Sequence, residues 1–439
     1  MSAIPSASIT SEQATPNLSL TALYEAPPSA APTTDEDAVQ FVTLAARAYA
    51  AVDEIPARTE EGLEYLARHL GFTADCTATA TAIFLTLSKG GRRWTEVIRV
   101  RASSPDFTRA VALHRVLERV AKDEITPRDA AERLTTLLGW RAQSSILHDT
   151  LAGALLSASA ALLLRADLSE MGLVALLGAT VGAVLHLVAG RETLMPLATV
   201  LLAAMASGAA FGFDRLNIAD IRPVPVLVAS LVILLPGWRL TVSMSELAQG
   251  HWTAGSGRFL AGVVTLLLLV VGVVVGQQAV ASNEKARLIL PAATNLPAWI
   301  RVLSPLVAGL SMTHLFNARR RDAPWIMLIC VITSLVAYGG GILLGSNAGA
   351  FVGAFTATAA SILLARRLRL PYAVLQQPAT VLLVPGTIGF LSFGSLVDQN
   401  VNRAIQTGFL MLMVALTLSI GALLARVALR QGMAREYER

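Results

Sequence analysis

Long apolar runs separated by short polar segments fill the chain from about residue 146 to 430. Each run has roughly 17–25 residues, the length that an α-helix needs to cross a hydrocarbon layer about 30 Å thick. The pattern predicts a polytopic α-helical membrane protein with ten transmembrane helices, in a first half (146–281) and a second half (297–430). The predicted spans are 146–165, 170–189, 193–213, 223–237, 258–281, 297–316, 324–344, 346–365, 371–395 and 404–427.

Residues 36–140 mix polar and apolar positions in the way typical of a soluble α/β domain. Helical periodicity predicts four helices, over 37–51, 58–70, 105–122 and 127–138. Between the second and the third, Thr and Ala alternate from Thr77 to Leu87, which predicts one strand. A turn at 89–92 and a second alternating run at 94–101 follow. We therefore expect a hairpin between two pairs of helices, in the order ααββαα.

The two ends of the chain lie outside these regions. Residues 1–35 are rich in Ser, Ala, Pro and Thr and contain no Lys or Arg, so the basic region that opens a signal peptide is missing. We interpret them as a disordered leader, and residues 431–439 as a cytoplasmic tail.

The charged residues separate the chain into the same parts. Overall, 54% of the residues are apolar and 15% are charged. The charged fraction is too low for an ordinary soluble enzyme, and the apolar fraction is too high for a disordered chain. Residues 1–141 hold 33 of the 65 charged side chains, and the longer remainder holds only 32. The net charge of +5 comes from arginines in the loops of an apolar body. It therefore does not predict a nucleic-acid partner.

The basic residues also predict an orientation, because cytoplasmic loops of membrane proteins carry an excess of Lys and Arg. If both termini face the cytoplasm, the inner loops and the tail hold thirteen basic residues and the outer loops hold seven. The clusters 319–321 and 366–369 carry most of this bias. We expect a multi-pass protein of a cell membrane with both termini, and the 36–140 domain, on the cytoplasmic side.

A Pro-Gly motif occurs at matching places in the two halves. Leu234-Leu235-Pro236-Gly237 recurs as Leu383-Val384-Pro385-Gly386, 149 positions later, and polar and small residues follow both copies. Each copy belongs to a block of five predicted spans, and an odd number of spans places two repeats in opposite orientations. Pro and Gly breaks at matching places in inverted repeats indicate a substrate site in secondary transporters. The alternative is that each motif simply ends a span at the membrane surface.

Few polar side chains near the spans could carry chemistry. Glu246 is the strongest candidate, because it follows the first Pro-Gly motif beside Ser243 and Ser245. The alternative is a solvated loop carboxylate. His186 and His314, near the ends of the second and sixth spans, could take part in proton coupling if they face a cavity. The candidate substrate or proton pathway is therefore Pro236, Gly237, Ser243, Ser245, Glu246, Pro385, Gly386, Ser395, His186 and His314.

Other chemistry has little support in the sequence. The two cysteines, Cys76 and Cys330, lie 254 positions apart and form no disulfide framework or metal motif. The 36–140 domain contains no GxSxG, HExxH, P-loop or dinucleotide-binding signature. We predict no catalytic residues, no metal and no cofactor. A membrane-anchored sensor or enzyme acting through this domain stays open as an alternative.

The motifs resemble those of the threonine/serine exporter family of bacterial inner-membrane proteins. The resemblance covers about 37–430. It rests on the segment 234–247 with Gly250, Gly257 and Arg258, and on Ala365-Arg366-Arg367, Pro371 and Val384-Pro385-Gly386. The family usually has Asp at position 246 and commonly Asn at 242, where this chain has Glu246 and Val242. The family also often has a small, Gly-containing segment where this chain has 53–58.

The resemblance implies a secondary exporter of small polar metabolites, with threonine and serine as substrates and the proton gradient as the driving force. A dicarboxylate such as succinate is the alternative substrate, because a split pair of family members is associated with its export. Arg239 and Arg258 near the first break could favour an anion, although both also fit the positive-inside pattern. The expected partners are the substrate, protons, the lipid bilayer and possible further copies of the chain in a homo-oligomer.

Overall fold

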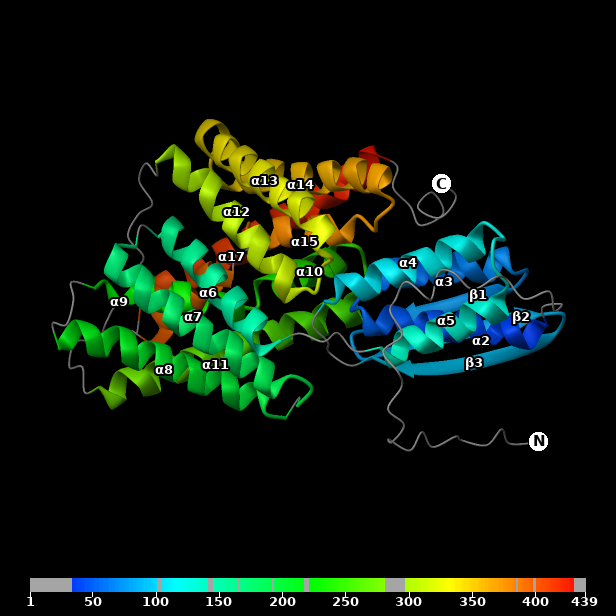
Figure 1. The fold of residues 1–439 in the computed structure, drawn as a ribbon, viewed down its shortest axis with the longest axis horizontal. Helices are drawn as coiled ribbons and strands as arrows, with labels where there is room; N and C mark the ends of the chain where they lie inside the picture. Colours follow the sequence, from blue (N-terminus) through cyan, green and yellow to red (C-terminus); the bar gives the residue numbers. More distant parts are fainter. Residues whose placement is uncertain are drawn as a thin grey trace.

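The computed structural model describes residues 34–100, 105–140, 145–164, 166–191, 193–216, 221–280, 297–383, 386–397 and 400–429. Figure 1 shows a small domain with a sheet beside a larger body of helices. The predicted leader, except for its last two residues, and the predicted tail lie outside the described residues, as does Pro385.

The N-terminal domain contains the four helices that periodicity predicts, and three strands instead of two. Its elements are α2 (Asp35–Ala51), α3 (Pro56–His69), β1 (Thr73–Ala78), β2 (Ala82–Lys89), β3 (Arg92–Arg99), α4 (Phe107–Ala121) and α5 (Pro127–Gly139). The sheet is antiparallel in the order β1-β2-β3. The turn between β2 and β3 is made by Gly90 and Gly91, both with positive φ, as a tight hairpin requires.

The single strand predicted from Thr77 to Leu87 was wrong, because this segment contains a hairpin turn. The Oγ1 of Thr79 accepts a hydrogen bond from the backbone N–H of Ala82. The backbone N–H of Thr79 in turn donates to the carbonyl oxygen of Ala82. Ala78 then pairs with Ile83 across the first two strands. A threonine side chain bonded to nearby backbone can make a turn without Gly, Pro or Asn. The usual turn signals are therefore missing from the sequence here.

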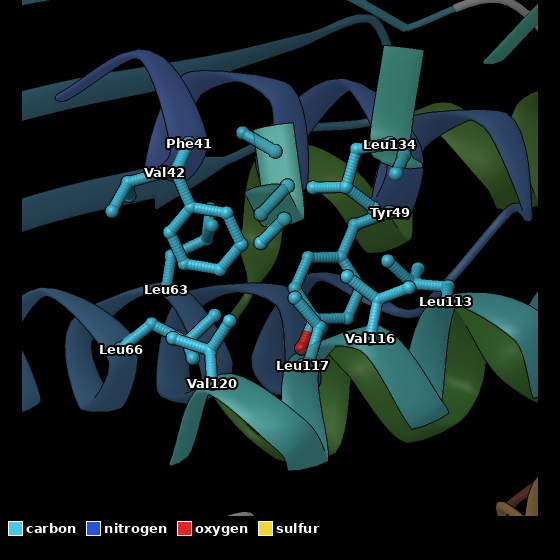
Figure 2. Packing of buried hydrophobic residues seen from close by; sticks show 14 of the residues in the cluster. Phe41, Val42, Tyr49, Leu63, Leu66, Leu113, Val116, Leu117, Val120 and Leu134 are labelled. Atoms are coloured by element: carbon cyan, nitrogen blue, oxygen red, sulfur yellow. The ribbon is translucent and has the colours of Figure 1, made fainter. Parts of the chain in front are cut away.

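The core of this domain lies between its helices and one face of the sheet. Figure 2 shows its centre, where Phe41 and Tyr49 from α2 meet leucines and valines from α3, α4 and α5. Alternate residues of β2, namely Ile83, Leu85 and Leu87, are buried in the same cluster. The other face of that strand is more exposed, with Phe84 at 47%. The alternation in the sequence therefore predicted a two-sided strand correctly over 83–87.

The body contains twelve α-helices among the described residues, of which α15 and α16 together make one candidate span. They are α6 (Ile146–Leu163), α7 (Leu168–Val188), α8 (Met195–Arg215), α9 (Pro223–Ser230), α10 (Gly237–Ala248), α11 (Trp252–Ala279), α12 (Ala298–Leu315), α13 (Ala323–Leu344), α14 (Ser346–Leu368), α15 (Ala373–Val381), α16 (Gly386–Val397) and α17 (Val401–Ala428). Eight spans within the described residues are long and apolar enough to cross a membrane, or nine with one bent pair. The sixth predicted span, α12, is not one of them, so a count of ten is not confirmed.

The fourth span does not end at its Pro-Gly motif, as the predicted boundary 223–237 implied. It begins as α9, passes through a 3-10 turn, η1 (Val232–Leu234), and continues as α10 to Ala248. The bend of 49° lies between Pro223–Ser230 and Val232–Ala248, five residues before Pro236. Since Pro236 cannot donate a backbone hydrogen bond, the helix breaks there and starts again at Gly237.

The helices of the second half pack in the same pattern as those of the first. In the first half, α6 packs on α7. Helix α9 packs on both α7 and α8, and α11 packs on both α8 and α10. In the second half, α12 packs on α13 in the same way. Helix α15 packs on both α13 and α14, and α17 packs on both α14 and α16. Between the halves, Ser159 on α6 and Ser304 on α12 each donate a hydrogen bond of 3.0 Å to the other's carbonyl oxygen. Two reciprocal hydrogen bonds of this kind are expected where two helices, here α6 and α12, are related by a local two-fold axis.

Glycines allow close packing between α8 and α11. A Cβ built on Gly276 would lie 2.2 Å from the carbonyl oxygen of Ala204 and 2.8 Å from Cβ of Ser207. Small residues at such contacts let two helix backbones approach in a membrane. This interface therefore has no room for an added methyl group.

We expect Gly276→Ala to lower the stability of the protein by about 1–3 kcal/mol, the usual cost of overpacking. Thermal unfolding of the detergent-purified protein measures the change. Gly339→Ala is the matched control, because a Cβ at that position meets nothing within 4 Å. Equal melting temperatures for the two variants would contradict the packing described for α8 and α11.

Candidate functional site

Two pairs of consecutive helices are interrupted at or just before a Pro-Gly motif. The first is α9 and α10, and the second is α15 and α16, which lie on either side of the second Pro-Gly motif. Each second segment has 12 residues, a length of about 18 Å at 1.5 Å per residue. This is little more than half of a hydrocarbon layer about 30 Å thick. Both segments are therefore half-helices that start inside the body.

The starts of the two half-helices touch each other. A Cβ built on Gly386 would lie 3.1 Å from the Cα of Gly237, 3.2 Å from its nitrogen and 3.2 Å from the Cβ of Leu235. The sequence predicted that the two motifs are equivalent, and the structure brings Gly237 and Gly386 together. Because a helix start carries unpaired N–H groups and a partial positive charge, two such ends converge here.

Glu246 lies near the other end of α10, and it is not a solvated loop carboxylate. Its side chain is 3% exposed, and its Oε1 is 3.0 Å from Nε of Arg258 on α11. Neither carboxylate oxygen has a partner with hydrogen-bond geometry among the described residues. The helix ends just beyond it, where Gly250 has a φ of 89° and the N–H of His251 donates to the carbonyl of Glu246.

Arg258 also binds a carboxylate of the N-terminal domain. Its Nη1 donates to Oδ1 of Asp53 over 3.2 Å, and the two side chains are 14% and 18% exposed. Burial raises the pKa of Asp53, while the nearby Arg258 and Arg239 act against that shift. The result is a cluster of one guanidinium between two carboxylates, Glu246 and Asp53, contributed by two parts of the molecule.

Sequence reasoning missed Asp53 and treated Arg258 mainly as a topology anchor. Asp53 has a φ of 53°, in the left-handed region that Asp tolerates better than most residues. The segment 53–58 departs from the usual family pattern, and this was the signal that could have pointed to it. The contact itself joins positions 205 residues apart, so no local pattern predicts it.

Three hydroxyl side chains lie on α10, and they differ in their hydrogen-bond partners. Ser243 is fully buried and lies one turn before Glu246, with its Oγ bonded to the carbonyl of Leu240. Ser245 accepts a hydrogen bond from Nε2 of Gln249 instead. The hydroxyl of Thr241 is buried without a hydrogen-bond partner in the described structure, one turn after Gly237. Thr241 was not among the predicted candidates.

The remaining candidates have other partners. His186 Nδ1 is 2.6 Å from Oδ2 of Asp149, and the ring of His314 stacks on His148 with centroids 5.8 Å apart. These pairs join α6 to the ends of α7 and α12, and no described contact links them to Glu246. Ser395, at the position on α16 that matches Glu246 on α10, donates to the carbonyl of Leu391 in its own helix.

Comparisons with known proteins agree with the motifs. A family model described as threonine/serine exporter matches residues 40–280, and a second model with the same description matches 301–428. The first match includes Asp53, Glu246 and Arg258, and the second includes Gly386. No curated protein and no solved structure matches the chain. Because the two models together cover most of its residues, the chain belongs to the threonine/serine exporter family of multi-pass membrane proteins.

Proposed function

We propose that the protein exports threonine and serine across a bacterial inner membrane by secondary transport coupled to protons. The observation that carries the proposal is the contact between Gly237 and Gly386, where two half-helices begin beside each other inside the body. Half-helix starts of this kind, at the interface of two repeats, form substrate sites in many secondary transporters.

The converging helix starts suit the carboxylate of an amino acid. Their unpaired N–H groups can donate hydrogen bonds to it, and their partial positive charges attract it. In the present conformation the two glycines are in van der Waals contact, so the ends of α10 and α16 have to separate before a substrate can bind between them. The recurring helix contacts of the two halves support a rocking motion of one half against the other.

The charges along α10 favour a substrate that also carries an ammonium group. Arg258 is shared between the carboxylates of Glu246 and Asp53, and Arg239 lies near Asp53, so these four charges balance and Glu246 is the acidic group that α10 itself carries. Glu246 would receive either the substrate's ammonium group or a proton. A dicarboxylate has no group for such a partner, which is why we favour an amino acid over succinate.

Efflux from proteoliposomes tests this proposal. Purified protein is reconstituted into vesicles loaded with radiolabelled threonine, serine or succinate, and a pH gradient is imposed. We expect threonine and serine to leave several times faster than from protein-free vesicles, and a protonophore to remove the difference. Efflux of succinate alone would replace the substrate assignment. No gradient-dependent movement of any of the three would contradict the transport proposal.

A further inference from the structure

The contact between Asp53 and Arg258 gives the N-terminal domain a part in the transport site. We propose that Asp53 is a positioning residue for transport, which acts as the second counter-ion of Arg258 whenever Glu246 becomes neutral. The inference rests on the proposed function, because it assumes that Glu246 takes up a proton or an ammonium group. It extends that function by assigning a role to a residue outside the membrane-spanning body.

The geometry of the cluster places Arg258 between two carboxylates. Arg258 approaches Glu246 through Nε and Asp53 through Nη1, so one guanidinium faces both carboxylates at once, at 3.0 and 3.2 Å. All three side chains are largely buried, and water cannot replace a lost partner at little cost. Other charged groups nearby are Arg239, which acts on Asp53, and two ion pairs with charged atoms 3.7 Å apart, His251–Glu60 and Arg58–Glu54.

A neutral Glu246 would no longer compensate the charge of Arg258. Removing one partner of a buried ion pair leaves the other charge uncompensated, which is strongly unfavourable. If Arg258 had Glu246 as its sole partner, uptake of a proton by Glu246 would leave a buried cation without a counter-ion. Asp53 removes this penalty, since Arg258 can keep its bond to Asp53 while Glu246 changes its charge.

Backbone hydrogen bonds to the end of α2 fix the position of Asp53. It follows α2 directly, and the N–H groups of Asp53 and Glu54 donate back to the carbonyls of Ala50 and Tyr49. Three residues after Asp53, α3 begins at Pro56, so the loop between the two helices has only a few residues. The position of Asp53 is therefore set by the helices of the N-terminal domain.

The domain itself is fixed on the body by contacts away from the cluster. The backbone N–H groups of Phe107 and Thr108 donate to the carbonyls of Phe316 and Asn317, over 2.8 and 3.2 Å. The rings of Phe107 and Phe316 also pack, with centroids 5.0 Å apart. These contacts fix the domain on the second half, and the bond between Asp53 and Arg258 on α11 joins the same domain to the first half.

The test compares variants at position 53 in the proteoliposome efflux assay with threonine. Asp53→Asn keeps the size of the side chain and removes its charge, so we expect gradient-driven efflux to fall by about tenfold or more. Asp53→Glu restores a carboxylate but places a longer side chain at a φ of 53°, so it should recover efflux in part, to several times the Asp53→Asn rate, which a purely structural loss would not allow. Asp75→Asn is the matched control, because Asp75 is an exposed carboxylate of the same domain.

Several outcomes would overturn the inference. It fails if Asp53→Asn transports within about twofold of wild type, or if Asp53→Glu is as impaired as Asp53→Asn. It also fails if Asp53→Asn causes an equal loss in an Arg258→Gln background, since Asp53 would then act without Arg258. Wild-type protein that moves no threonine or serine would instead contradict the proposed function, so the two failures can be distinguished.

Discussion

Replacing Glu246 by glutamine should lower gradient-driven export of threonine by about tenfold or more, which corresponds to a rise of at least about 1.4 kcal/mol in the transport barrier. Glutamine has nearly the same size, but it can neither take up a proton nor pair as an anion with Arg258. The side chain is buried against Arg258, so the change acts on a charged contact and not on a solvated surface. Efflux from proteoliposomes across a range of pH values measures the effect.

Glu96→Gln provides the control for this prediction. Glu96 is an exposed residue of β3, and surface substitutions of this kind change stability by about 0.5 kcal/mol or less. Both variants should be purified and shown to melt at similar temperatures before transport is compared. If Glu246→Gln exports threonine at the wild-type rate with the same pH dependence, Glu246 has no part in the site.

Gly386→Val is the second substitution with a large expected effect. A single Cβ at this position already lies 3.1 Å from the Cα of Gly237, and the two methyl groups of valine need further space. The start of α16 would have to move away from α10, at a cost of about 1–3 kcal/mol or more. We expect threonine efflux to fall to the level of protein-free vesicles, because the valine side chain would occupy the space between the two helix starts where the substrate carboxylate is proposed to bind.

Gly172→Val separates this effect from a general effect of valine in a helix. Gly172 lies on α7, is exposed on the surface of the body, and a Cβ there meets nothing within 4 Å. We expect this variant to transport at close to the wild-type rate. Wild-type transport by Gly386→Val would show that the close contact of the two half-helices is not needed for function.

The sequence predicted most helices of this fold because their causes are local. Apolar runs long enough to cross a membrane marked the spans, and helical periodicity marked α2, α3, α4 and α5 to within a few residues at either end. The paired glycines Gly90 and Gly91 located the β2–β3 turn. The repeated Pro-Gly motif pointed to Gly237 and Gly386, although nothing in the sequence alone could show that they touch.

Features that depend on side chains or on distant contacts could not be predicted in this way. The turn at Thr79 is made by a hydroxyl group, which leaves the Thr/Ala alternation unbroken in the sequence. The fourth span continues beyond Pro236 as α10. The sequence of the Pro-Gly motif does not show which helices surround it, so this continuation could not be predicted. Asp53 reaches Arg258 through the docking of one domain on the other, so its role follows only from the fold.

Binding of threonine to purified protein tests most directly the claim that the junction of α10 and α16 is the substrate site. Titration calorimetry in detergent measures binding without the rest of the transport cycle, for wild type, Gly386→Val and Gly172→Val. We predict that wild type and Gly172→Val bind threonine with similar Kd values and that Gly386→Val binds at least about tenfold more weakly. An unchanged Kd for Gly386→Val would contradict the account and place the substrate elsewhere.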